Sequence, residues 1–156
     1  MVRRLRDELK QSRPFPTVQE EVLVGLARTA DSLERGFVGV FKALGLTATQ
    51  YNVLRILRGA GAPGLPCGEI ADRMVTRDPD LTRLLDRLER RGLATRARDG
   101  TDRRVVTTRI SQAGLSLLEE LEAPLAETRR QLLGHMAEKR LHELADLLDE
   151  ARSASA

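Results

Sequence analysis

The chain has 156 residues, of which 41% are hydrophobic and 31% charged, with a formal net charge of +3. This length suffices for one hydrophobic core, and the composition is that of a folded soluble protein. We expect no membrane segment and no signal peptide, because no apolar run approaches the length of a membrane span and no signal-peptide pattern opens the chain. The single cysteine excludes an internal disulfide and fits a cytoplasmic location.

Charge is distributed unevenly along the chain. Residues 73–109 hold eleven arginines and six acidic residues, whereas the rest of the chain has slightly more acidic than basic residues. Positive charge concentrated on one segment is typical of a surface that binds a polyanion.

The first part of the chain, residues 1–45, predicts an N-terminal arm followed by one long helix. Val2, Leu5 and Leu9 have helical spacing within the arm. Thr17 and Glu20 have the spacing of a capping box, and Gly45 ends the apolar periodicity. A helix this long has more apolar surface than a small domain needs, so we expect it to pack against a partner helix.

The second part, residues 46–110, predicts a winged helix-turn-helix domain. A second capping pattern at 47–50 begins a helix that runs to about Arg58, and a glycine-rich loop follows. Leu65-Pro66 is expected to form a single bridge to the wing sheet. A short helix beginning at Cys67 and a turn at 75–77 then lead to a second helix, at 79–91.

The helix at 79–91 has one apolar and one charged side. Its apolar side has the spacing of an amphipathic helix and consists of Leu81, Leu84, Leu85 and Leu88. Asp78 before Pro79 is expected to cap the helix, and Gly92 to end it. The opposite side presents guanidinium groups to phosphates or guanine edges, and it carries Pro79, Arg83, Asp86 and Arg90, flanked by Asp80 and Arg87.

A hairpin follows, with strands at 93–98 and 105–110 and a turn at 99–104. Arg103 and Arg104 stand at or beside its tip, where an arginine can enter a minor groove. Taken alone, the segment fits a solvated surface hairpin equally well. Its place directly after a helix-turn-helix favours a wing.

The third part, residues 111–156, predicts two leucine-rich helices. Ser111 is expected to cap the first, Pro124 to bend it, and the chain to turn into the last helix near Gly134. We expect a fold that is mainly α with a small β-hairpin wing. The long N- and C-terminal helices are better explained by a dimer interface than by an intramolecular bundle, because so many apolar stripes surround so small a domain.

Four segments in order resemble the MarR (multiple antibiotic resistance regulator) family: GLTATQYNVLRIL, EIADRM, LTRLLDRLERRGL and DGTDRRVVTTRISQAG. The resemblance implies a homodimeric winged-helix transcription factor, usually a repressor, whose binding to double-stranded DNA is relieved by a small molecule or by oxidation. It places the recognition helix at 79–91 and the wing at 99–104. In the wing, Asp102 is expected to steady the tip and Arg104 to enter the minor groove. The residues expected to contact DNA are Thr76, Arg77, Pro79, Asp80, Thr82, Arg83, Arg87, Arg103 and Arg104.

The signal that releases such a protein is not encoded in a motif. An effector pocket between the dimer helices and the DNA-binding domain would have Phe37, Phe41 and Tyr51 in its wall, with Phe15 nearby, although all of them suit a core equally well. The oxidation-sensing branch of the family has its cysteine in the first long helix. This chain has none there, and Cys67 stands instead at the start of a short helix, where a redox role is an alternative.

Two other classes of function are an assembly module and an enzyme. A winged-helix module that binds an acidic protein partner through the arginine side would share the same sequence features. An enzyme is not expected, because the chain lacks the usual nucleophile, zinc-protease, phosphate-loop and dinucleotide motifs. We expect no cofactor, and no metal site at His135 and His142, since these histidines are seven residues apart without a close ligand pair.

Overall fold

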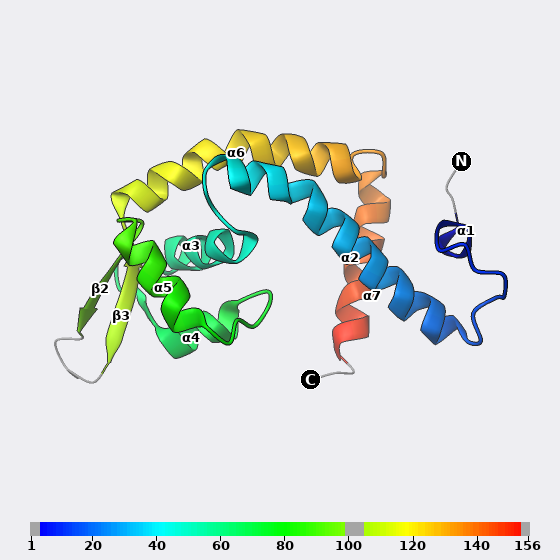
Figure 1. Cartoon of the computed structure of the whole chain (residues 1–156), viewed down its shortest axis with the longest axis horizontal. Helices are drawn as coiled ribbons and strands as arrows, with labels where there is room; N and C mark the ends of the chain where they lie inside the picture. The colour runs from blue at the N-terminus through cyan, green and yellow to red at the C-terminus, as the bar shows by residue number, and fades with distance from the viewer. Residues whose placement is uncertain (1–3, 99–104, 154–156) are drawn as a thin grey trace. The chain divides into compact units, whose positions relative to one another are not determined.

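A computed structural model describes residues 4–98 and 105–153 of the chain (Figure 1). Internal contacts divide the chain into two compact units, residues 1–37 and 38–156, and each unit is described by itself. Val2 and the wing turn at 99–104, with Asp102, Arg103 and Arg104, lie outside the described residues. The functional division expected at 45 and 110 stays a prediction.

The first unit contains helix α1 (Leu5–Glu8) and most of helix α2 (Val18–Ala43), whose end from Val38 on belongs to the second unit. The Thr17 hydroxyl accepts the backbone N–H of Glu20 at 3.2 Å, as the capping pattern predicts. The expected N-terminal helix is only about one turn long, and it contacts α2 through an ion pair between Glu8 and Arg28 at 3.9 Å.

The second unit contains the remaining elements in the order that the sequence predicts. Helix α3 begins with a complete capping box. The backbone nitrogen of Thr47 lies 3.0 Å from the Gln50 side-chain oxygen, and the backbone nitrogen of Gln50 lies 3.1 Å from the Thr47 hydroxyl oxygen. The elements are α3 (Ala48–Ala60), β1 (Leu65–Pro66), α4 (Cys67–Arg73), α5 (Leu81–Arg90), β2 (Ala94–Arg98), β3 (Val106–Ile110), α6 (Gln112–Leu133) and α7 (Glu138–Ser153).

The core of this unit forms where α3 contacts α4, α6 and the sheet. All four leucines of the apolar side of α5 are buried, which confirms the predicted periodicity. The largest side chains with almost no exposure are Leu54, Leu57, Ile70, Leu85, Leu88, Leu121 and Leu125. This core fixes one side of α5 and leaves its other side to solvent.

The three strands form an antiparallel sheet in the order β1-β3-β2. Ala94 pairs with Ile110 and Arg98 with Val106, so β2 and β3 form the expected hairpin. The two-residue β1 pairs with β3 on the other side, with Leu65 opposite Thr108, which confirms the bridge expected there. The hairpin is therefore attached to the core at its base.

Ser111 connects the hairpin, the end of α5 and the start of α6. Its hydroxyl accepts the N–H of Gly114 at 3.0 Å and donates to the carbonyl of Gly92 at 2.6 Å. Its own N–H donates to the carbonyl of Leu93 at 3.1 Å. Gly92 has φ of +69°, the left-handed conformation expected where glycine ends a helix. Two of these hydrogen bonds fix the start of α6 to the residues that follow α5, and the third caps α6.

The terminal helices differ from the core in their exposure. The described part of α7 buries no side chain completely, and Leu144 and Leu147 are exposed on it. On α2 the exposed apolar side chains are Val18, Val22, Leu23, Leu26 and Val38. No helix in residues 4–98 or 105–153 is long and apolar enough to cross a membrane.

Candidate nucleic-acid interface

Helix α5 begins two residues later than the sequence predicts. The carboxylate of Asp78 accepts the backbone N–H of Asp80 at 2.8 Å, which closes a turn ahead of the helix. Asp80 has φ of −114° and ψ of 31°, so it precedes the first helical residue, Leu81. The expected cap at Asp78 and first helical position at Pro79 are therefore wrong. Because the helix starts later, Thr82 and Arg83 lie in its first turn.

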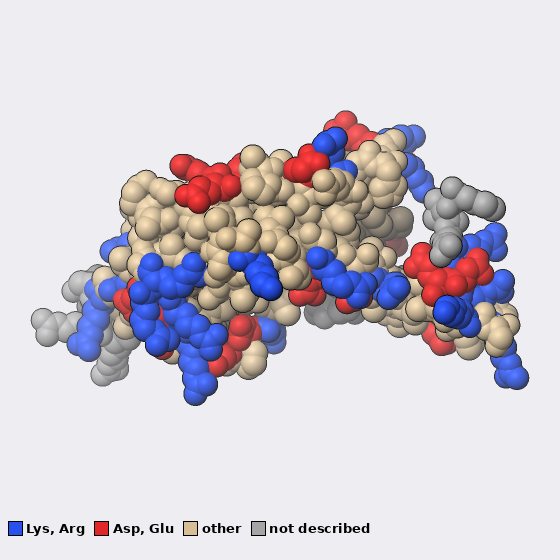
Figure 2. All heavy atoms as spheres, turned by 45° about the horizontal axis from the view of Figure 1, so that its top comes forward, with Lys and Arg blue, Asp and Glu red and all other residues tan. Residues whose placement is uncertain are grey.

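The side of α5 that faces solvent carries the expected basic groups. The Arg83 side chain is 75% exposed and lies 3.5 Å from the carboxylate of Asp80, a pair that holds it only weakly. Figure 2 shows Lys and Arg side chains gathered over the part of the molecule that holds α5 and the hairpin. The predicted DNA-contacting residues within the described part of the chain are all exposed: Thr76, Arg77, Pro79, Asp80, Thr82, Arg83 and Arg87.

The turn before α5 is attached to α3. The side-chain oxygen of Asn52 accepts the backbone N–H of Val75 at 3.0 Å. The Val75 side chain itself is 87% exposed, next to Thr76 and Arg77. The turn is therefore held through its backbone, while its side chains remain available for contact.

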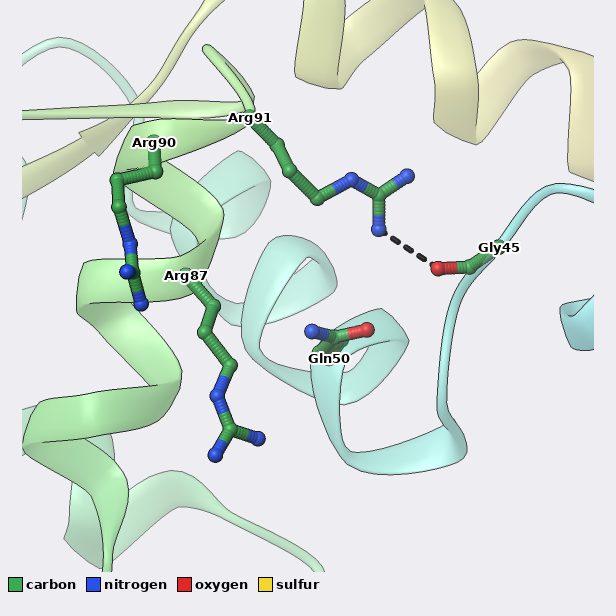
Figure 3. Close-up of a pocket in the computed structure, with 5 residues that line it drawn as sticks. All are labelled: Gly45, Gln50, Arg87, Arg90 and Arg91. Atoms are coloured by element: carbon green, nitrogen blue, oxygen red, sulfur yellow. Dashed lines mark hydrogen bonds between the residues drawn. The ribbon is translucent and has the colours of Figure 1, made fainter.

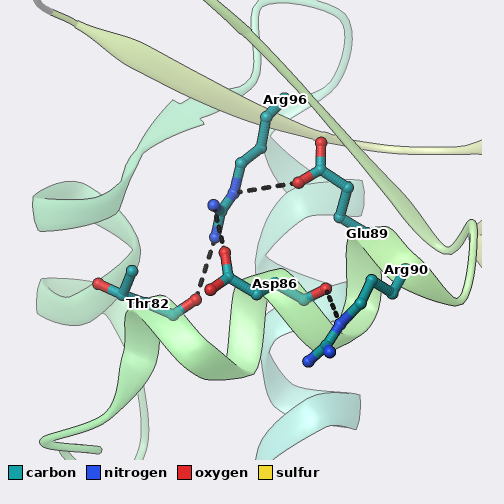
Figure 4. Close-up of polar contacts among 5 residues, drawn as sticks. All are labelled: Thr82, Asp86, Glu89, Arg90 and Arg96. Atoms are coloured by element: carbon teal, nitrogen blue, oxygen red, sulfur yellow. Dashed lines mark hydrogen bonds and ion pairs between the residues drawn. The ribbon is translucent and has the colours of Figure 1, made fainter.

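Arg96 on β2 fixes the hairpin to α5, which the sequence analysis missed (Figure 4). Its guanidinium donates to the carboxylate of Asp86 at 2.6 Å and to the carbonyl of Thr82 at 3.1 Å, and it lies 3.9 Å from Glu89. Asp86, expected on the exposed side of α5, is turned toward the hairpin and paired there. The signal was the two-residue period of β2, which puts Arg96 on the same side as buried Ala94.

We expect the substitution Arg96→Ala to lower the free energy of unfolding by about 1–2 kcal/mol, because two hydrogen bonds are lost and two acidic groups are left unpaired. The free energy of unfolding of Arg96→Lys should lie between those of the wild type and Arg96→Ala, since a single ammonium group cannot reproduce the bidentate contact of the guanidinium. Chemical denaturation measures the change. Arg58→Ala serves as the matched control on the exposed end of α3. Equal stability of Arg96→Ala and this control would show that the network does not hold the hairpin.

Two of the aromatic residues expected near an effector, Phe41 and Tyr51, lie side by side. The rings of Phe41 and Tyr51 are 4.9 Å apart between centroids, and the guanidinium of Arg55 lies 5.7 Å from the centre of the Tyr51 ring. Phe41 is buried and Phe37 is half-buried. Phe41 and Tyr51 thus form a packed pair beside a cation, which suits a core and a pocket wall alike.

Cys67 is exposed and is the first residue of α4. Within residues 4–98 and 105–153, no three His, Cys, Asp or Glu side chains are grouped closely enough to hold a metal ion.

The helix pair α4–α5, the turn held by Asn52 and the hairpin fixed by Arg96 define a winged helix-turn-helix protein. The model of the MarR family matches residues 46–106 of the chain. The chain is 41% identical to the MarR transcription factor of Planctomyces limnophilus, whose crystal structure it matches over 87% of its own length and 98% of the other, with a TM-score of 0.67. The chain belongs to the MarR family, a family of transcription regulators that bind DNA.

Two further proteins show the range of this similarity. The homoprotocatechuate degradative operon repressor of Escherichia coli is 26% identical, over 85% of this chain and 88% of the repressor. The MepR–DNA complex of S. aureus has the same fold, with a TM-score of 0.74 and 22% identity over 83% of this chain and 94% of MepR.

Proposed function

We propose that the protein is a homodimeric repressor that binds a pseudo-palindromic operator and is released by a small, mostly apolar molecule. The observation that carries the proposal is the exposed arginine side of α5, positioned by a buried leucine side and flanked by a hairpin that Arg96 fixes to the same helix. In this proposal α5 is the recognition helix. Thr82 and Arg83 in its first turn would meet base edges, as recognition helices do with their N-terminal residues.

The other expected contacts have supporting roles in the proposal. Thr76, Arg77, Pro79 and Asp80 lead into the recognition helix, and Arg87 follows Arg83 one turn later on the same side. Arg103 and Arg104 would bring the wing to the minor groove, with Asp102 steadying its tip. Support for DNA as the ligand comes from MepR, whose structure is that of a DNA complex.

Exposed apolar side chains on the terminal helices support a homodimer. Val22 and Leu23 on α2 are 51% and 67% exposed, and Leu147 on α7 is 61% exposed. Apolar side chains repeated along helices that bury little of their own surface are typical of helices that pack against another chain.

Two related recognition helices would reach successive major grooves about one helical turn apart, roughly 10 base pairs between half-site centres. We therefore expect the protein to sediment as a dimer at micromolar concentration and to protect two half-sites with that spacing upstream of its own gene. Footprinting with hydroxyl radicals measures the spacing. Sedimentation as a monomer both with and without DNA would contradict the proposal. Binding that depends on an acidic protein and shows no preference for any duplex would favour the alternative, an assembly module.

A phenolic ligand is the proposed signal, with the Phe41–Tyr51 pair and Phe37 in the wall of its pocket. The E. coli relative represses an operon for degradation of homoprotocatechuate, which is a phenolic acid. We expect homoprotocatechuate or a similar phenolic acid to weaken operator binding about five- to 150-fold, the range of typical allosteric coupling. The ligand must bind the DNA-incompetent state more tightly, since equal affinity for both states would shift nothing.

Fluorescence anisotropy of a preformed operator complex measures release by the phenolic acid and, separately, by peroxide. The Cys67→Ser variant is the control, because the Cys67 thiol is exposed. Release by peroxide that disappears in Cys67→Ser would replace the ligand with an oxidative signal. Release by phenolic acid that is unchanged in Cys67→Ser would support the ligand.

A further inference from the structure

A shallow hollow of about 440 Å³ lies between the C-terminal half of α5 and the start of α3 (Figure 3). Its lining residues are Gly45, Gln50, Arg87, Arg90 and Arg91. Three of the five carry a permanent positive charge, and the proposed operator contact assigns a role only to Arg87. Positive charges gathered around one hollow favour the binding of an anion there.

The acidic side chains nearest in sequence do not supply that partner. Asp86 and Glu89 are paired with Arg96 on the other side of α5, at 2.6 and 3.9 Å. Within the described residues, Arg87 makes no ion pair, and Arg90 makes only a long bond of 3.4 Å from Nε to the carbonyl of Asp86. Both acids are thus turned toward Arg96, and neither forms an ion pair with an arginine of the hollow in the described residues.

Arg91 is positioned by the backbone rather than by an acid. Its guanidinium donates to the carbonyls of Gly45 at 2.7 Å and of Leu44 at 3.3 Å. These hydrogen bonds hold the guanidinium at the rim of the hollow. The carbonyl acceptors are neutral, so they do not balance its positive charge. A fixed guanidinium beside two free ones is a favourable arrangement for an anion with several oxygens.

Gln50 adds a neutral donor at the base of the hollow. Its side chain is 8% exposed, and its Oε1 atom accepts the N–H of Thr47 at 3.0 Å within the capping box. In the described part of the chain its Nε2 group donates to no acceptor, and Figure 3 shows the amide nitrogen on the side toward Arg87. No buried side-chain nitrogen or oxygen in the described residues lacks a hydrogen-bond partner, so this Nε2 group is open to solvent and can donate to a ligand in the hollow.

We propose that Arg87, Arg90, Arg91 and Gln50 form a binding site for a phosphate-type oxyanion. The oxyanion has two possible sources with the same chemistry: a phosphodiester of the bound duplex or a free small anion. The first source rests on the proposed function, because Arg83, Arg87 and Arg90 follow one another on the same side of α5. A backbone phosphate seated here would fix the recognition helix along the groove.

The test compares the wild type with the double variant Arg87→Gln/Arg90→Gln. Both arginines are exposed, so the fold should tolerate their loss. The matched control is Arg129→Gln/Arg130→Gln, which removes the same charge from α6, where these arginines pair with Glu122 and Glu127. A third variant, Gln50→Glu, keeps the Thr-x-x-Glu capping box but replaces the amide donor with a carboxylate.

The first measurement is binding of inorganic phosphate to the free protein at constant ionic strength, followed by the NMR signals of the arginine Nε–H groups. We expect about tenfold or greater weakening in the double variant and in Gln50→Glu, since a single charge-assisted hydrogen bond of ordinary strength accounts for such a factor. The control pair should bind phosphate as the wild type does.

The second measurement is the salt dependence of binding to a mixed-sequence duplex. Each phosphate contact contributes about 0.9 to the slope of log K against log salt, so the double variant should lose about two units. A change in the duplex slope alone identifies a phosphodiester, a change in phosphate binding alone identifies a small anion, and a change in both identifies a site where free phosphate competes with DNA.

If the double variant and Gln50→Glu match the control pair in both measurements, the proposed site is wrong. That result leaves the operator proposal intact, provided that the wild type still prefers one duplex sequence. A wild type that binds no duplex, with phosphate binding that is lost in the variants, would overturn the operator proposal and leave the oxyanion site standing.

Discussion

Gly114→Ala is expected to destabilise the protein by about 3 kcal/mol or more, at the upper end of what overpacking costs. A Cβ at this position would lie 2.3 Å from the carbonyl oxygen of Leu93 and 2.7 Å from Cγ1 of Ile110. The Leu93 oxygen cannot easily move, because it accepts the N–H of Ser111 at 3.1 Å. The substitution therefore disrupts the joint that links α5, the hairpin and α6, and DNA binding should weaken with it.

Gly59→Ala is the matched control for this prediction. Gly59 lies in α3, and an added Cβ would meet no described atom within 4 Å. The same substitution there should raise stability by up to about 1 kcal/mol, since alanine favours a helix over glycine. Thermal and denaturant unfolding of both variants provide the measurement. If Gly114→Ala unfolds at the same denaturant concentration as the wild type, the backbone around Leu93 is more adaptable than its hydrogen bonds indicate.

Arg83→Ala is expected to reduce operator affinity far more than affinity for random DNA. A bidentate contact between arginine and guanine discriminates against other bases by about 1–3 kcal/mol, or roughly five- to 150-fold in affinity. Arg83 lies in the first turn of α5, and among the described residues its guanidinium forms an ion pair only with the exposed carboxylate of Asp80. It is therefore free to leave that pair when a base edge is offered.

Arg90→Ala provides the comparison for Arg83→Ala on the same helix. Arg90 lies in the last turn of α5, next to the hollow, where we expect it to meet a phosphate. Its loss should weaken binding to operator and to random DNA by similar factors. Equal losses on both duplexes for Arg83→Ala as well would show that Arg83 contacts only the phosphate backbone.

The order of the elements could be predicted from the sequence because each one carries a local signal. The capping box at Thr47 and Gln50, the leucine periodicity of α5 and the left-handed glycine at 92 each act over a few residues. Such signals report on short-range hydrogen bonds and on one apolar side. They were confirmed for this reason.

The start of α5 was placed wrongly because two local signals compete there. Asp78 before Pro79 is typical of a helix start, but the same carboxylate also closes a turn by accepting the N–H of Asp80. The turn is formed, and the helix begins at Leu81. A sequence pattern alone does not show which N–H a short acidic side chain will accept.

The network around Arg96 could not be predicted from the sequence, because it joins residues of two different elements, β2 and α5. Asp86 has the spacing of an exposed residue on α5, and only the position of β2 shows that it is paired. The same holds for the hollow, since Gln50 and Arg87 are brought together by the packing of α3 near α5. Sequence periodicity describes one helix or strand at a time, so it does not predict contacts between elements.

The guanidinium of Arg91 is bound to the backbone of residues 44 and 45, so substitutions at the two ends of this contact have unequal effects. Both of its hydrogen bonds end on backbone carbonyls, so they do not depend on the side chain at position 44. Leu44 can be replaced without loss of the connection, and the requirement at position 45 is for φ of +65°, which favours glycine. We therefore expect the connection between the α2–α3 loop and the end of α5 to tolerate sequence changes in the loop but not the loss of the Arg91 guanidinium.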